Sequence, residues 1–119
     1  MLSKEDSALD YCYLTTTGRK TGKPREIEIW FGSQGETLYL LAGGGEGAHW
    51  VRNIRADPAV TVRVGDRTYV ASGRALVPGS DEDAAARRLL LEKYQPRYSG
   101  DLAGWGRTAL PVALDFAPA

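Results

Sequence analysis

A tight, cation-rich turn between two strand-like runs constrains this chain more than any other feature of its sequence. Residues 18–24 read Gly-Arg-Lys-Thr-Gly-Lys-Pro, in which the glycines and the proline are ordinary turn residues. Residues 11–17 before the turn are mostly aromatic or β-branched, and Ile27, Ile29 and Phe31 after it recur with the period of a half-buried strand. The sequence therefore predicts a β-hairpin with four cations at its tip: Arg19, Lys20, Lys23 and Arg25.

These four cations favour an anionic ligand. Like charges on one short turn repel one another, and the turn needs only its glycines and its proline in order to form. An anionic partner therefore explains the cations better than folding does, and we predict a clamp for a phosphate or a polycarboxylate. The alternative is that hairpin tips face water, where Lys and Arg are ordinary residues.

A glycine run, Ala42-Gly-Gly-Gly-Glu-Gly47, follows the apolar run 37–41 and precedes the helical segment 48–56. Glycines lack side chains and allow positive φ, so the backbone N–H groups of such a loop can approach a flat or anionic ligand closely. The start of the following helix adds partial positive charge. The run is thus a candidate ligand cradle, and the alternative is a flexible loop between a strand and a helix.

The helix after the glycine run carries an amide among apolar neighbours. Each residue of an α-helix turns by about 100°, which divides the side chains of this segment between two arcs. The first arc holds His49, Trp50, Asn53 and Ile54, and the second holds Val51, Arg52 and Arg55. Trp50 is either a core residue or the wall of a ligand site. Asn53 is either a local backbone cap or a hydrogen-bonding partner beside a ring system, and burial of its amide requires a partner.

The rest of the chain reads as short strands joined by tight turns. We predict strands near 10–17, 25–32, 36–42, 59–65, 67–77 and 108–116 and helices near 47–56 and 81–95. Turns at 33–35 and 65–66 join antiparallel hairpins, and Ser80 with Asp83 resembles a capping box at the start of the second helix. The pattern predicts a mainly β (α+β) fold: one domain over residues 1–119, a small six-stranded closed barrel with two or three short helices on its rim.

Composition excludes several classes of function. With 15 basic and 15 acidic residues the chain has no net charge, which argues against a nucleic-acid binder. One cysteine, Cys12, and one histidine, His49, cannot form a disulfide or an ordinary tetrahedral zinc site, and Cys12 is expected to pack in the core. The polar start and the lack of a long apolar run predict a cytoplasmic protein without a membrane span. We expect a monomer or a homodimer.

Three motifs in this order resemble the deazaflavin-dependent nitroreductase family. They are the segment 15–25, the glycine run, and the segment 50–62, which reads Trp-Val-Arg-Asn-Ile-Arg-Ala-Asp-Pro-Ala-Val-Thr-Val. The resemblance implies a split β-barrel of the flavin-reductase and FMN-binding type. It also implies binding of coenzyme F-420, an 8-hydroxy-5-deazaflavin whose side chain ends in a phosphate and an oligoglutamate tail.

The resemblance also implies which residues bind this cofactor. The turn cations would face the anionic tail, and the glycine run and the following helix would lie at the ring end. The positions that match are Arg19, Lys20, Lys23, Pro24, Arg25, Ala42, Gly43, Gly44, Gly45, Trp50 and Asn53. Members that reduce nitro compounds commonly have a proline in place of Glu28 and a lysine within the glycine run. This chain has neither, so a quinone, an enone and a nitro compound are equally open as the electrophile.

The chemistry that the resemblance implies is hydride transfer from the reduced cofactor to a small electrophile. A proton must also reach the product, and Tyr94, Tyr98 or solvent are its candidate donors. Trp105 is a candidate cover for the substrate side. Two alternatives remain: an oxidoreductase of the same fold that binds FMN, and a non-catalytic carrier of the cofactor or of an apolar ligand.

Overall fold

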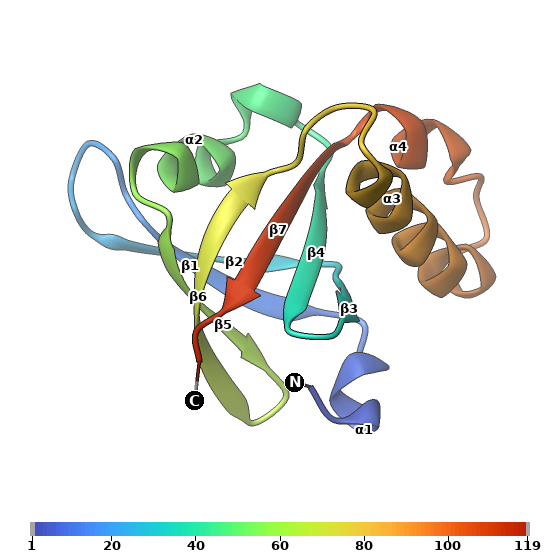
Figure 1. Cartoon of the computed structure of the whole chain (residues 1–119), viewed down its shortest axis with the longest axis horizontal. Coiled ribbons are helices and arrows are strands. Elements are labelled where there is room, and N and C mark those ends of the chain that lie inside the picture. Colours follow the sequence, from blue (N-terminus) through green and yellow to red (C-terminus); the bar gives the residue numbers. More distant parts are fainter. Residues whose placement is uncertain (1, 119) are drawn as a thin grey trace.

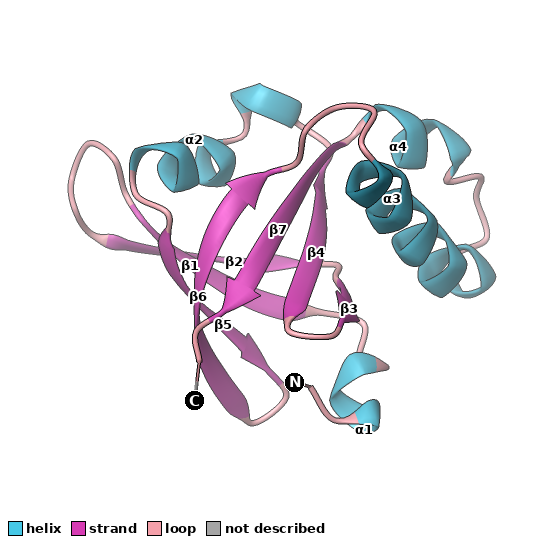
Figure 2. Cartoon of the chain, in the orientation of Figure 1, coloured by secondary structure: helices cyan, strands magenta, loops and turns pink. Residues whose placement is uncertain are grey.

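A computed structural model describes residues 2–118 and shows a curled antiparallel sheet flanked by helices (Figures 1 and 2). The strands are β1 (Cys12–Thr17), β2 (Pro24–Ile29), β3 (Gly32–Gln34), β4 (Thr37–Ala42), β5 (Ala59–Val64), β6 (Arg67–Ala75) and β7 (Leu110–Phe116). The α-helices are α1 (Lys4–Ser7), α2 (His49–Ala56), α3 (Asp81–Tyr94) and α4 (Ala103–Thr108). Single 3-10 turns span Gly45–Gly47 and Gln95–Arg97.

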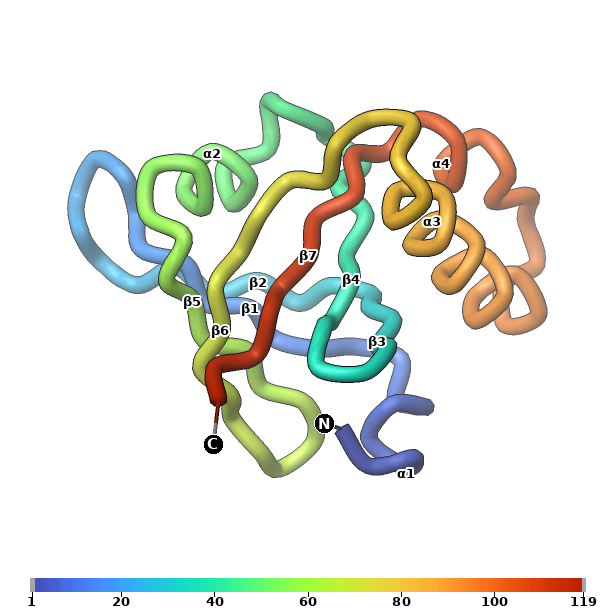
Figure 3. Tube along the Cα trace, viewed as in Figure 1, coloured from blue at the N-terminus to red at the C-terminus, as the bar shows by residue number. Residues whose placement is uncertain are grey.

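One bent strand gives the sheet its curl. The strand order is β2-β1-β5-β6-β7-β4-β3, and the two outermost strands, β2 and β3, are consecutive in the chain. Only Trp30 and Phe31 separate β2 from β3, yet the two strands pair at opposite ends of the sheet: β2 with β1, and β3 with β4. Because both ends of the sheet are held by one short segment, the sheet curls into a half-barrel, as the trace in Figure 3 shows. Helix α2 lies at one end, and α3 and α4 cover the other side (Figure 1).

The predicted architecture is right in class and wrong in detail. The described residues form seven strands rather than six, because the run 25–32 breaks at the bend. The turn predicted at 33–35 is wrong: residues 33 and 34 pair with β4, and the chain reverses at Gly35, where φ is +61°. Residues 2–118 contain four α-helices rather than two or three, since α1 and α4 are too short to show a helical period. The sheet is a curled half-barrel rather than a closed barrel.

Strand β4 lies between two core clusters. Leu38 and Leu40 face the cluster enclosed by the curled sheet and α2, whereas Tyr39 and Leu41 face the cluster beneath α3. Successive side chains of a strand point to opposite faces, so burial of both faces explains the continuous apolar run of this strand. Cys12 packs in the first cluster as predicted, and burial raises the pKa of its thiol to about 12.

Helix α3 begins at the predicted cap and fixes the bend of the sheet at its other end. Ser80 Oγ accepts a hydrogen bond from the N–H of Asp83 at 3.1 Å. Tyr94 is the last residue of α3, and its side chain is buried. Its hydroxyl accepts a hydrogen bond from the N–H of Phe31 at 2.9 Å and donates one to the carbonyl oxygen of Asp10 at 2.7 Å. Burial raises the pKa of this phenol. Tyr94 therefore satisfies backbone groups that the break between β2 and β3 leaves without a sheet partner.

The substitution Tyr94→Phe tests this anchor. We expect it to lower the free energy of unfolding by about 1 to 3 kcal/mol, because the buried N–H of Phe31 loses its acceptor. Urea denaturation measures the loss. Tyr98→Phe is the matched control, since Tyr98 is 50% exposed and should change stability little. Equal effects of the two substitutions would contradict the anchoring role.

Within residues 2–118, every helix is too short or too polar to cross a lipid bilayer.

Candidate cofactor-binding site

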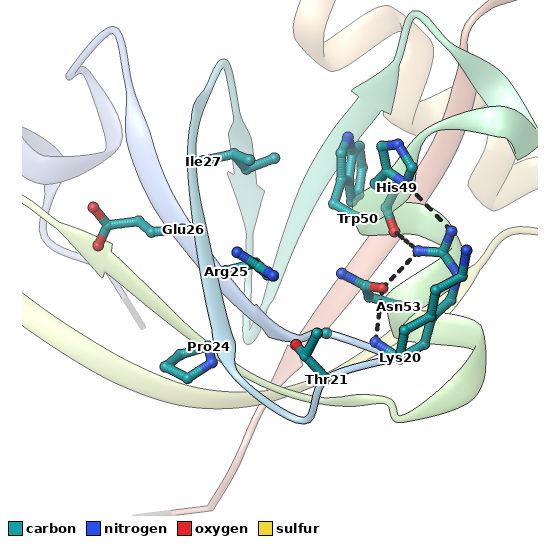
Figure 4. A pocket seen from close by; sticks show the side chains of 11 residues that line it. Lys20, Thr21, Pro24, Arg25, Glu26, Ile27, His49, Trp50 and Asn53 are labelled. Atoms are coloured by element: carbon teal, nitrogen blue, oxygen red, sulfur yellow. Dashed lines mark hydrogen bonds between the residues drawn. The ribbon is translucent and has the colours of Figure 1, made fainter.

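A cavity of about 600 Å³ lies between the loop of residues 18–23, strand β2 and helix α2 (Figure 4). Its size is that of a pocket for a small organic ligand. It is lined by Gly18, Arg19, Lys20, Thr21, Pro24, Arg25, Glu26, Ile27, His49, Trp50 and Asn53.

The loop that forms one wall is closed by its own backbone. The N–H of Gly18 donates to the carbonyl of Lys23 at 2.8 Å, and the N–H of Gly22 donates to the carbonyl of Gly18 at 2.8 Å. Gly22 has a φ of +72°, which favours glycine. A Cβ on Gly18 would lie only 2.9 Å from Thr21 Oγ1, so the loop also closes too tightly there for a side chain. Gly18 and Gly22 thus allow the closed conformation of the loop, and this conformation determines where the loop cations lie.

Asn53 attaches the loop to α2. Its Oδ1 accepts from the backbone N–H of Arg19 at 3.2 Å and from Nη1 of the same residue at 2.9 Å. Its Nδ2 donates to Thr16 Oγ1 at 3.1 Å, and both Asn53 and Thr16 are buried. The buried amide therefore has the partners that its desolvation requires, and those partners are the strand and the loop of the cationic hairpin.

The buried face of α2 is rotated from the arc that the sequence predicts. Val51, placed on the second arc, is buried together with Asn53 and Ile54, while His49 is exposed. The helix packs on β1 and β6, so its contact face extends past Ile54 to Val51. His49 consequently sits at the solvent edge of that face, where Arg19 Nη2 lies 3.2 Å from its Nδ1.

The cavity carries positive charge that the fold does not compensate. Among residues 2–118, Arg19, Lys20 and Arg25 form no ion pair with a carboxylate. Glu26 is the one acidic residue of the lining, and its side chain points to the other side of β2 from Arg25 and Ile27 (Figure 4). Successive residues of a strand alternate between its faces, which accounts for this separation. The wall thus suits an anionic ligand.

An apolar wall lies beside these cations. Trp50 from α2 and Ile27 from β2 are partly buried against the main core cluster and both line the cavity. In Figure 4 the side chain of Ile27 points from its strand toward the α2 side of the cavity, where Trp50 lies. Flat or branched apolar side chains next to cations suit a ligand with an anionic part and an apolar part.

The structure brings together about half of the residues predicted to bind the cofactor. Arg19, Lys20, Pro24, Arg25, Trp50 and Asn53 line the cavity. Lys23 and the glycine run do not. Ala42 is the buried end of β4, and a Cβ on Gly43 would lie 4.0 Å from Trp105 of α4.

Five lining residues were not predicted: Gly18, Thr21, Glu26, Ile27 and His49. Gly18 and Thr21 belong to the same turn as the predicted cations, and Ile27 lies two residues after Arg25 and so shares its strand face. These signals were available in the sequence. His49 shares the predicted helical arc of Trp50 and Asn53, so the same helical period could have found it.

The candidate proton donors lie in an aromatic cluster around Trp30. The Trp30 ring stacks on Tyr94 at 4.3 Å between centroids and makes edge contacts with Trp105 at 5.5 Å and Tyr98 at 5.9 Å. None of the four lines the cavity. Tyr94 is bound into the core, whereas Tyr98 is half exposed. Trp105 belongs to helix α4 rather than to a loop.

Comparison with known proteins assigns this chain to a family. The model of the F-420H2-dependent quinone reductase family matches residues 4–116. The chain belongs to that family. A curated F-420H2-dependent quinone reductase of Mycobacterium tuberculosis is 26% identical over 104 residues, which cover 85% of this chain and 68% of the relative. Family membership confirms the predicted enzyme class and coenzyme F-420 as its cofactor.

Two solved structures share the fold of this chain. An F-420-H2-dependent reductase, FDR-A, superposes with a TM-score of 0.71 and 25% identity, covering 89% of this chain and 94% of that one. The heme storage protein HutZ of Vibrio cholerae superposes with a TM-score of 0.79 at 15% identity, covering 98% and 88%. The second likeness concerns the fold alone.

Asn53→Ala tests how the loop is held. We expect a loss of about 1 to 3 kcal/mol in the free energy of unfolding, because the substitution leaves Thr16 Oγ1 and the N–H of Arg19 without their partner. The loop should also be cut faster by trypsin at its Arg and Lys residues. Exposed Arg52 on the same helix supplies the control, Arg52→Ala. Unchanged loop cleavage in Asn53→Ala would show that the closed turn holds itself.

Proposed function

We propose that the cavity between the 18–23 loop and α2 binds the phosphate and oligoglutamate tail of coenzyme F-420. The observation that carries this proposal is the group of three lining cations, Arg19, Lys20 and Arg25, with no ion-pair partner among residues 2–118. Arg and Lys side chains form strong, charge-assisted hydrogen bonds with phosphate and carboxylate groups. A tail with several negative charges suits three cations better than a single phosphate does.

The residues of the cavity divide the binding task. Arg19, Lys20 and Arg25 would hold the tail, and Trp50 with Ile27 would offer apolar contact to the part of the cofactor next to the ring. Asn53 keeps the loop in place and is a positioning residue. When bound, the coenzyme supplies a hydride, which is the difficult part of the chemistry, so the protein needs no nucleophile of its own. Its task is to hold and orient the reactants.

We propose a quinone as the electrophile. Support comes from the family description and from the curated relative, each of which is a quinone reductase by name. Glu28 and the lysine-free glycine run set this chain apart from the nitro-reducing pattern. For the proton that the product needs, the bound hydroxyl of Tyr94 is poorly placed, which leaves solvent and the half-exposed Tyr98.

An FMN-dependent reaction is the competing proposal, because one phosphate would also use part of the cationic wall. Fluorescence titration of the purified protein with each cofactor separates the two. We expect tight binding of coenzyme F-420 and weak binding of FMN. The reverse order would overturn the proposed function.

Charge reversal at two neighbouring lysines tests the tail site. Lys20 lines the cavity and Lys23 does not. We expect Lys20→Glu to weaken binding of coenzyme F-420 by about 1 to 3 kcal/mol, the scale of a lost charge-assisted contact. Lys23→Glu, which makes the same change in net charge, should cost less than about 1 kcal/mol because its side chain is exposed outside the cavity.

The control for both variants is their thermal unfolding, which should match that of the wild type. If Lys23→Glu weakened binding as much as Lys20→Glu, the tail would be attracted by the net charge of the loop and not bound in this cavity.

A further inference from the structure

We propose that His49 is a further ligand-binding residue of this cavity, a cation that joins Arg19, Lys20 and Arg25 only when its imidazole is protonated. The inference rests on the proposed binding of an anionic tail. It makes affinity for that tail depend on pH through one identifiable group.

The contact between Arg19 and His49 defines the present state of the ring. Arg19 Nη2 lies 3.2 Å from His49 Nδ1. A guanidinium has hydrogen-bond donors and no acceptor, so Nδ1 must be the acceptor in this pair. The imidazole in this arrangement is therefore neutral, and its proton is on Nε2. The Arg19 side chain lies against α2, where its acceptors are neutral: this ring, the carbonyl oxygen of His49 and Asn53 Oδ1.

Protonation changes this contact in a defined way. A protonated ring carries hydrogens on both nitrogens and cannot accept from Arg19, and it places a second cation within reach of the guanidinium. Arg19 Nη2 then loses this partner and becomes available to a ligand. The loop itself stays attached, because the backbone N–H and Nη1 of Arg19 still donate to Asn53 Oδ1. The cavity gains one positive charge and one freed end of the Arg19 guanidinium.

The groups around His49 determine the sign of the effect. Cations face it from the loop and from β2, and the one lining carboxylate points to the other side of β2 (Figure 4). Nearby Glu46 is paired with Arg55 at 2.7 Å. The charged groups of the lining are Arg19, Lys20, Arg25 and Glu26, and Arg52 follows His49 by one turn of α2. A bound anion offsets the repulsion between these cations, so anion binding and proton uptake favour each other.

The experiment compares the wild type with His49→Gln, whose amide cannot be protonated in this range. Coenzyme F-420 is titrated into each protein from about pH 8 to about pH 5.5, the range in which histidines change charge. We expect affinity to rise on acidification by about three- to tenfold more in the wild type than in His49→Gln, the scale of coupling to one partly exposed charge. The deazaflavin chromophore without phosphate and oligoglutamate should show no such difference. The ring hydroxyl of the chromophore is present in both ligands, so this comparison also accounts for its own titration.

A second readout does not depend on turnover or on affinity. Because the chain has one histidine, its Hε1 proton resonance belongs to His49 alone. Saturating coenzyme F-420 should move the midpoint of its NMR titration to higher pH.

The outcomes separate the two levels of the proposal. Equal pH dependence of F-420 affinity in wild type and His49→Gln, or a midpoint that F-420 leaves unmoved, would overturn the role of His49 alone. Failure of the wild type to bind F-420 at any pH would overturn the proposed function and this inference with it.

Discussion

The buried amide of Asn53 holds a repulsive, cation-rich loop against a helix, and the geometry of the site depends on this attachment. One side chain contacts the loop backbone, a loop guanidinium and the preceding strand through Thr16. A buried amide is stable only when its groups are paired, so the loop cannot leave α2 without leaving Asn53 unsatisfied. The cost of that loss is what keeps like charges together at the mouth of one cavity.

The bend between β2 and β3 makes the room for this arrangement. The segment before the bend, β2, pairs with β1, and the segment after it, β3, pairs with β4, so the sheet curls. Helix α2 covers one end of the curled sheet, and α3 and α4 cover the other side (Figure 1). Tyr94 of α3 holds the bend through its hydrogen bond with Phe31. Its ring stacks on Trp30, which is the centre of the aromatic cluster on that side. The cations lie at the opposite end, beside α2 (Figure 1). The aromatic cluster and the cations of the cavity are thereby separated in space.

What the sequence could predict follows from the range of the interactions involved. The hairpin, its cations and the Ser80 cap are local patterns, and each was found where predicted. The break at Trp30 depends on a tyrosine 63 residues away from Phe31, so no window along the strand reveals it. The glycine run, whose chemistry predicted a cradle, does not line the cavity, and Gly43 lies near Trp105, which is 62 residues away in the sequence. His49 lines the cavity together with Trp50 and Asn53, as their shared helical arc allows, but its contact with Arg19 joins residues 30 positions apart.

The choice of neutral partners for Arg19 explains how the site can be both ordered and charged. A carboxylate at the position of Asn53 would hold the guanidinium as firmly, but it would cancel the charge that an anionic ligand needs. An amide oxygen and an imidazole nitrogen each accept one hydrogen bond from the Arg19 guanidinium and leave its charge in place. They also yield more readily than a carboxylate, because a neutral acceptor binds a guanidinium more weakly than an anion does. A tail bearing phosphate and carboxylate groups can therefore compete for Arg19 without having to displace an ion pair.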